Sequence, residues 1–134
     1  RNGDVFCDVG SGNGRLVLAA ASCYASTLAQ ARGVEIVPAL HRAALEAKSR
    51  AATSSADLSP IDFVLADVHE RRDLLLDVDV CFCYSTAFSA SGPYLSQLSM
   101  TFGLGMHEGT RVMTVDKMLL SDGPWQFDEI GSIE

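Results

Sequence analysis

Three glycines at alternate positions, Gly10, Gly12 and Gly14, follow the apolar run 4–9 near the start of the chain. Glycines in this pattern let the backbone turn tightly and leave no Cβ between the main chain and a ligand. The helix predicted after them would present unpaired N–H groups and the positive end of its dipole, which stabilise an anionic group by about 0.3–1 kcal/mol. A strand-to-helix turn needs only one glycine, so the pattern favours a ligand-binding loop, which also contains Ser11.

Two charged residues beside this loop discriminate between classes of ligand. Nicotinamide-binding loops usually have the pattern G-x-G-x-x-G, and the last position of that pattern is Arg15 here, a bulky cation. Asp8, two residues before the first glycine, would repel the pyrophosphate of a dinucleotide, because like charges repel at short range. The same carboxylate would attract a ligand that carries an ammonium group. A nicotinamide-dependent (NAD) oxidoreductase is therefore an alternative that Arg15 and Asp8 disfavour.

Two further acids stand at the ends of later predicted strands. Glu35 closes the second predicted strand, 33–37, about twenty residues after the glycine loop, where a carboxylate accepts both hydroxyls of a ribose. Asp67 closes the third, and a carboxylate there can accept from the exocyclic amine of adenine, with the apolar Val68 beside the ring. Since ligands of such sheets bind beyond the carboxyl ends of the strands, Asp8, Glu35 and Asp67 predict a cradle for a nucleoside that carries an amine.

These motifs resemble a known class of enzymes over nearly the whole chain. The pattern DxGxGxG at 8–14, the strand-end Glu35 and the step Ala66-Asp67 are similar to the class I, seven-stranded S-adenosylmethionine-dependent methyltransferases. Within that class the chain most resembles the non-SET histone lysine methyltransferases of the disruptor-of-telomeric-silencing family. The segments that carry this second resemblance are 4–12, 33–35, 84–88, 108–114 and Lys117.

The resemblance implies S-adenosylmethionine as the cofactor and gives each motif a contact with it. Gly10 and Gly12 would line the methionine and ribose portion, in a loop that includes Ser11 and Gly14. The other implied contacts are Asp8 with the amino end, Glu35 with the ribose hydroxyls, Asp67 with the adenine amine, and Ile36 and Val68 with the two faces of the adenine ring.

The segment 84–88, Tyr-Ser-Thr-Ala-Phe, follows the fourth predicted strand, and the resemblance places it beside the transferable methyl group. The histone enzymes have Asn where this chain has Tyr84. The sulfonium methyl is already activated, so its transfer depends on in-line positioning and on exclusion of water, and a dry channel favours a neutral lysine acceptor. Tyr84 and Ser85 are the candidate catalytic contacts to the acceptor; packing against Phe88 is their alternative role.

The implied activity is methyl transfer to a protein lysine, on a histone or another lysine-bearing protein. A second alternative, besides the oxidoreductase, is a non-catalytic module of the same fold that binds the cofactor or another protein. The Tyr found at position 84 keeps this alternative open.

Strand-like and helix-like stretches alternate along the chain, which predicts an α/β, Rossmann-like, doubly wound and mostly parallel sheet. The predicted strands cover 4–9, 33–37, 61–66, 78–84, 111–115 and 125–130, and the predicted helices cover 12–27, 38–50 and 93–102. At 134 residues we expect a single domain, 1–134. The leading substrate segment and the last strand of the family are missing from this pattern, so we expect a core truncated at both ends.

Composition limits the partners. The 10 Lys+Arg against 17 Asp+Glu give a net charge of -7, which argues against direct nucleic-acid binding by this segment. Every apolar run is shorter than the roughly 20 residues that cross a bilayer, so we expect no membrane insertion. Neither the four cysteines nor the three histidines have metal-ligand spacing, so no metal site is expected. Reduced cysteines indicate an intracellular protein, nuclear or cytoplasmic.

Overall fold

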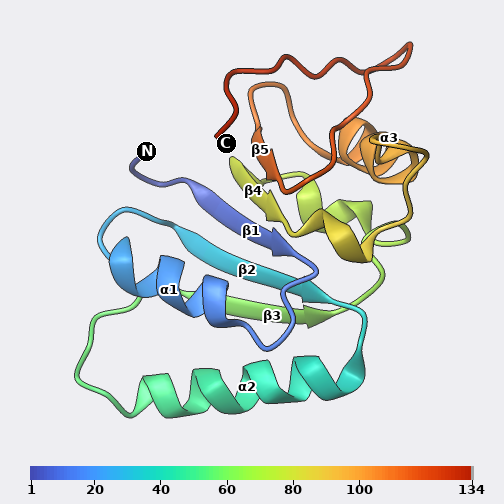
Figure 1. Ribbon diagram of the computed structural model, residues 1–134. Coiled ribbons are helices and arrows are strands. Elements are labelled where there is room, and N and C mark those ends of the chain that lie inside the picture. The colour runs from blue at the N-terminus through green and yellow to red at the C-terminus, as the bar shows by residue number, and fades with distance from the viewer. Residues whose placement is uncertain (134) are drawn as a thin grey trace.

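A computed structural model describes residues 1–133, and its centre is a parallel five-stranded sheet (Figure 1). The strands are β1 (Val5–Val9), β2 (Gln30–Glu35), β3 (Ile61–Leu65), β4 (Val80–Cys83) and β5 (Arg111–Thr114), in the order β3-β2-β1-β4-β5. The central strand β1 places Asp8 opposite Gly33 of β2 on one side and Phe82 of β4 on the other. All four pairings are parallel, so every strand ends at the same edge of the sheet. The predicted α/β, Rossmann-like fold is confirmed.

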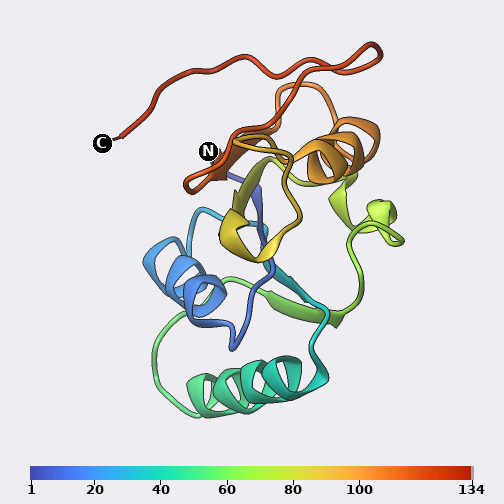
Figure 2. The same cartoon turned by 45° about the vertical axis from the view of Figure 1, so that its right-hand side comes forward.

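Helices cover both faces of this sheet (Figures 1 and 2). They are α1 (Arg15–Cys23), α2 (Pro38–Ala52) and α3 (Ser96–Gly105), with the short 3-10 turns η1 (Arg72–Leu75) and η2 (Ser85–Ala87). Under α1 and α2 the core consists of Val17, Ala21, Ala31, Ala44 and Phe63. Under α3 and η1 it includes Cys7, Val9, Leu75, Leu98 and Phe102. Residues 7 and 9 of β1 therefore face α3, and residues 6 and 8 face α1, as the alternation along a strand requires.

Two glycines bring α1 close to the sheet. A Cβ at Gly33 would lie 2.7 Å from Phe63 Cδ1, and one at Gly14 would lie 2.5 Å from Phe63 Cζ. The Phe63 ring therefore fills the space that both positions leave empty. Gly14 also has a φ of 81°, a left-handed conformation that ends the loop, so α1 begins at Arg15 and not at residue 12 as expected.

The sixth strand expected at 125–130 is wrong, since the sheet of residues 1–133 has five strands. Trp125 forms only an isolated bridge with Asp122. Its indole packs over α3 at Gly103, where a Cβ would lie 2.2 Å from Trp125 Cγ, and its Nε1 donates to the Leu120 carbonyl at 3.1 Å. The aromatic residue that suggested a strand therefore serves to pack this segment on α3. The other five expected strands are present, with β2 beginning three residues early, at Gln30.

Candidate functional site

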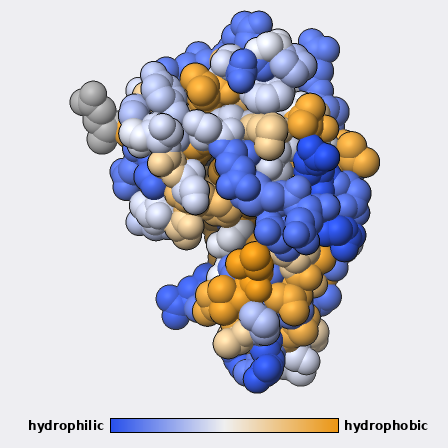
Figure 3. Space-filling view, turned by 90° about the vertical axis from the view of Figure 1, so that its right-hand side faces the viewer, coloured by the Kyte–Doolittle hydropathy of each residue, from blue (hydrophilic) through white to orange (hydrophobic). Residues whose placement is uncertain are grey.

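A cavity of about 600 Å³ opens at the edge where the strands end. It lies at the point where the connections from β1 and from β4 leave toward opposite faces of the sheet, which is where open α/β sheets bind ligands. Figure 3 views this edge, and hydrophobic side chains gather on its lower part. At the start of α2, Ile36, Val37 and Leu40 are 60%, 43% and 41% exposed, and all three line the cavity. The cavity thus has an apolar wall beside the strand ends.

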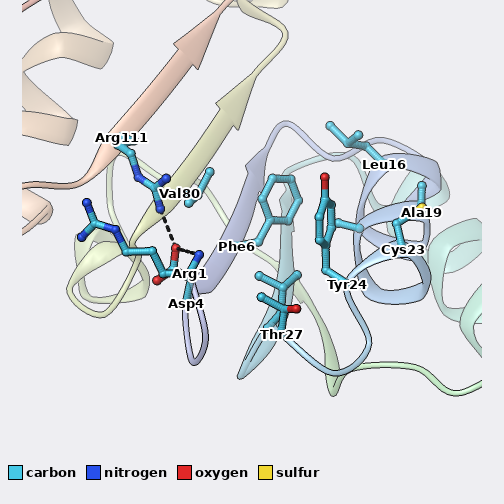
Figure 4. A pocket seen from close by; sticks show the side chains of 12 residues that line it. Arg1, Asp4, Phe6, Leu16, Ala19, Cys23, Tyr24, Thr27, Val80 and Arg111 are labelled. Atoms are coloured by element: carbon cyan, nitrogen blue, oxygen red, sulfur yellow. Dashed lines mark hydrogen bonds and ion pairs between the residues drawn. The ribbon is translucent and has the colours of Figure 1, made fainter. Parts of the chain in front are cut away.

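A second cavity, of about 480 Å³, lies between α1 and the early residues of β1 and β4 (Figure 4). Its walls are largely apolar, with Phe6, Leu16 and Tyr24 among them. Of its three charged side chains, Arg1, Asp4 and Arg111, the last two form an ion pair with each other. Because the one carboxylate is already paired, the groove has fewer free polar groups than the cavity at the strand ends, where Glu35 and Asp67 both remain able to accept. The cavity at the strand ends is therefore the candidate site.

The glycine loop forms the floor of this cavity. The amides of Gly10 and Ser11 both donate to the Val34 carbonyl, at 2.8 and 3.1 Å, which holds the loop against the end of β2. Gly10 and Gly12 have positive φ values of 81° and 55°, a conformation that favours glycine. A Cβ at Gly12 would meet nothing within 4 Å, so the backbone there is open to a ligand. Both residues line the cavity.

Glu35 joins the loop to the strand end. Its Oε2 accepts from the Gly12 amide at 2.7 Å and its Oε1 accepts from the Val37 amide at 2.8 Å. The residue is only 7% exposed yet lines the cavity. Each carboxylate oxygen has two acceptor sites, so one on each remains for a ligand. The carboxylate is thus held in one orientation, with the remaining capacity to accept two hydroxyls.

Asp8 and Ser11 are buried and do not line the cavity. Asp8 is 5% exposed, and its carboxylate accepts no hydrogen bond from residues 1–133. Burial, together with the negative charge of Glu35, raises the pKa of Asp8 to about 7. The Ser11 hydroxyl is also buried without a partner among the described residues, and a Cβ on Gly33 would lie 2.7 Å from it. A cationic group over the loop would stabilise the Asp8 carboxylate.

Asp67 and its neighbours form the opposite end of the cavity. Asp67 Oδ1 accepts from the His69 amide at 2.9 Å, which fixes the carboxylate just beyond β3. Val68 is 4% exposed and packs in the core under α3, while Ile36, across the cavity mouth, is largely exposed. All three residues line the cavity. A carboxylate with apolar side chains beside it is suited to a flat ring that carries an amine.

The two candidate catalytic residues, Tyr84 and Ser85, lie in different environments. Tyr84 is 55% exposed and lines the cavity. Ser85 is fully buried and does not line it: its hydroxyl donates to the Val115 carbonyl and accepts from the Val115 amide at 3.0 Å. The expectation that Ser85 contacts an acceptor is therefore corrected, because its hydroxyl is used to join η2 to the chain after β5.

Two lining residues, His69 and Phe88, were not assigned to the site by the sequence. Their ring centroids lie 6.3 Å apart at 81°, an edge-to-face contact. Phe88 also covers the glycine loop, since a Cβ on Gly10 would lie 3.3 Å from its Cε2. His69 Nδ1 lies 2.6 Å from Thr101 Oγ1 of α3. The one sequence signal for His69 was its position two residues after Asp67.

Within residues 1–133, no three His, Cys, Asp or Glu side chains are grouped so that they would hold a metal ion. In the same range, no helix combines the length and the apolar character needed to cross a bilayer. The described residues do fit a cofactor of the S-adenosylmethionine type: Glu35 and Asp67 can accept hydrogen bonds from hydroxyls and an amine, apolar side chains of the cavity suit a ring, and a buried Asp8 without a hydrogen-bond partner lies two residues before the glycine loop.

No protein-family model and no curated protein sequence match this chain. Solved structures do match. A methyltransferase dependent on S-adenosylmethionine from Thiobacillus denitrificans, solved with S-adenosyl-L-homocysteine, has a TM-score of 0.57 and 14% identity, over 85% of this chain and 42% of its own. A TehB-like methyltransferase from Corynebacterium glutamicum has a TM-score of 0.60 and 14% identity, over 85% of this chain and 55% of its own. The mitomycin 7-O-methyltransferase MmcR has a TM-score of 0.65 and 14% identity, over 84% of this chain and 30% of its own.

This chain therefore spans about half or less of the length of the solved chains it matches. At these identities the likeness concerns the fold, and these structures do not single out the disruptor-of-telomeric-silencing family. The parallel sheet, its strand order and the cavity at the strand ends give this chain the fold of the class I S-adenosylmethionine-dependent methyltransferases.

Proposed function

We propose that this chain binds S-adenosylmethionine in the cavity at the strand ends and forms the cofactor-binding part of a methyltransferase that acts on a protein lysine of the histone type. The cofactor assignment rests on one observation: Gly12, Glu35 and Asp67, which follow or end three different strands, all line one cavity. Glu35 accepts the ribose hydroxyls, Asp67 accepts from the adenine amine, and Ile36 and Val68 flank the ring.

Bound S-adenosylmethionine supplies a methyl group on a positively charged sulfur. The chain's own residues position it: the open backbone of Gly12 lets the ligand approach, and the negative charge of Asp8 stabilises a nearby ammonium group. Phe88 lies over Gly10 and keeps water from the loop.

Tyr84, on the same wall, contacts the acceptor. Support for a lysine acceptor comes from the half-buried ring of Phe88 at the cavity, since an apolar surround lowers the pKa of an amine.

The cofactor assignment is tested by calorimetric titration of the protein with S-adenosylmethionine, S-adenosylhomocysteine and NAD. We expect both sulfur compounds to bind and NAD not to bind; binding of NAD alone would overturn the proposal. Glu35→Ala is expected to weaken S-adenosylhomocysteine binding by about 10- to 100-fold, because a charged acceptor of two hydroxyls is lost. The matched control is Glu46→Ala, an exposed acid on α2 outside the cavity.

The acceptor is tested separately. Methyl transfer from labelled S-adenosylmethionine to histones, to nucleosomes and to lysine peptides is measured by mass spectrometry. We expect a mass increase of one or more methyl groups on lysine. Cofactor binding without transfer to any lysine would overturn the acceptor assignment and favour a non-catalytic module, while the cofactor assignment would stand.

A further inference from the structure

His69 and Asp67 lie side by side at the end of the cavity that the proposed function gives to adenine. The His69 amide donates to Asp67 Oδ1 at 2.9 Å, and both residues line the cavity together with Val68 between them. Two side chains that can accept hydrogen bonds therefore stand at one place on the wall. The mechanism described above uses only the Asp67 carboxylate.

Contacts from α3 favour one tautomer of the His69 ring. Thr101, only 2% exposed, donates its single hydroxyl hydrogen to the Gln97 carbonyl at 3.1 Å. With that hydrogen on the Gln97 carbonyl, the Thr101 oxygen can accept from His69 Nδ1, which lies 2.6 Å away, and this arrangement favours the tautomer that carries its proton on Nδ1. In this tautomer the other nitrogen, Nε2, is an acceptor, and it receives no hydrogen bond from residues 1–133.

The same contacts hold the ring in place. Nδ1 is directed at α3, and Nε2, on a different corner of the ring, is directed away from Thr101. Phe88 packs edge-to-face against the imidazole from the segment after β4. A side chain that is already held from two sides loses little conformational entropy when a ligand binds to it.

We infer that His69 Nε2 is a second acceptor for the exocyclic amine of the cofactor's adenine ring, which makes the site specific for a 6-aminopurine. This inference rests on the proposed function. An adenine amine has two N–H groups; the Asp67 carboxylate accepts one of them and His69 Nε2 accepts the other. A 6-oxopurine would direct an oxygen lone pair at both acceptors and would be rejected, because unpaired buried polar groups are costly.

A double-mutant cycle, with one change on the protein and one on the ligand, isolates the contact between His69 and the adenine amine. Calorimetry gives the Kd of S-adenosylhomocysteine and of its purine analogue, which lacks only the exocyclic amine, for the wild-type protein and for His69→Leu. We expect loss of the amine to weaken wild-type binding by about 10- to 100-fold, and this factor to be about 3- to 10-fold smaller in His69→Leu. Equal factors in the two proteins would overturn the inference.

Two further variants complete the experiment. Thr101→Val keeps the imidazole but removes the partner of Nδ1, so we expect the factor by which loss of the amine weakens binding to decrease in this variant too. If His69→Leu does not fold, Thr101→Val is the test of the inference. His41→Ala, on α2 outside the cavity, should keep the wild-type factor. Absence of any S-adenosylhomocysteine binding by wild-type protein would overturn the proposed function itself, whereas binding with no His69 effect overturns only this inference.

Discussion

The Gly12 amide donates a hydrogen bond to Glu35 Oε2 across 2.7 Å and so joins the glycine loop to the end of the neighbouring strand. The two residues are far apart in sequence, and each has a separate reason to be at the cavity. The bond makes the floor of the cavity and its ribose-facing carboxylate a single unit, so a change in the loop also moves the carboxylate.

A side chain would meet different neighbours at Gly12 and at Gly14, so we expect alanine at the two positions to lower the free energy of unfolding by different amounts. Gly12→Ala is expected to lower the free energy of unfolding by about 1–2 kcal/mol, the cost of a left-handed residue with free space around it. Gly14→Ala should cost about 2–5 kcal/mol, because its Cβ also collides with Phe63. Urea unfolding measures both, and Phe63→Leu should recover part of the Gly14→Ala loss. Equal losses for the two glycines would contradict the packing described for Phe63.

The raised pKa of Asp8 predicts a pH dependence of stability. The pKa of this carboxyl is about 7 when folded and about 3.8 when unfolded, so between these values the folded protein binds the extra proton. Its contribution to stability therefore decreases as pH rises from about 4 to about 7, by at most about 4 kcal/mol.

Asp8→Asn should remove this decrease, so the variant should be more stable than wild type at pH 8 and show little difference at pH 4. Urea unfolding across this range gives the difference curve. A difference that does not change with pH would contradict the burial of an ionisable Asp8. At pH 8 the same variant should bind S-adenosylmethionine more weakly, because the charge that attracts its ammonium group is gone.

Ser85→Ala separates a structural role from a catalytic one. Both Val115 backbone groups would lose their partner, so we expect the free energy of unfolding to decrease by about 1–3 kcal/mol. S-adenosylhomocysteine affinity should not change. Thr86→Ala, an exposed neighbour, is the control for stability. Unchanged stability in Ser85→Ala would show that the buried hydroxyl does not join these segments.

Trp125 is the one tryptophan of the chain, so its fluorescence reports directly on its packing over α3. Gly103→Ala would place a Cβ 2.2 Å from Trp125 Cγ and displace the indole. We expect the emission to move to longer wavelength and the free energy of unfolding to decrease. Gly131→Ala, where a Cβ meets nothing within 4 Å, should leave both unchanged. An unshifted Gly103→Ala spectrum would place the indole elsewhere.

Local chemistry in the sequence was sufficient for five of the six expected strands and for several residues of the cavity wall. Glu35 and Asp67 each follow a short β-forming run, and a parallel sheet brings such ends together without knowledge of the loops. The glycine loop was predicted in the same way, because three alternate glycines directly follow the first β-forming run. Gly10 and Gly12 are on the cavity, whereas Gly14 serves the packing of Phe63.

The parts that the sequence did not predict depend on contacts between distant segments. Ser85 looked available because nothing local indicates that Val115, thirty residues later, takes both of its hydrogen bonds. Trp125 has strand-forming character, but the empty space at Gly103 gives it a better contact than a strand partner would. His69 has no local motif, and its tautomer depends on Thr101 of a later helix.

The central position of β1 has a consequence for how the protein is made. The Val5 amide donates to Asp79, 74 residues later, and Phe6 pairs with Val80 of β4. On a ribosome that synthesises the chain from its N-terminus, the strand that carries the glycine loop stays unpaired along one edge until β4 emerges. During that interval the backbone groups along this edge of β1 are free to pair with other chains, so the strand that leads into the glycine loop is open to mispairing during translation.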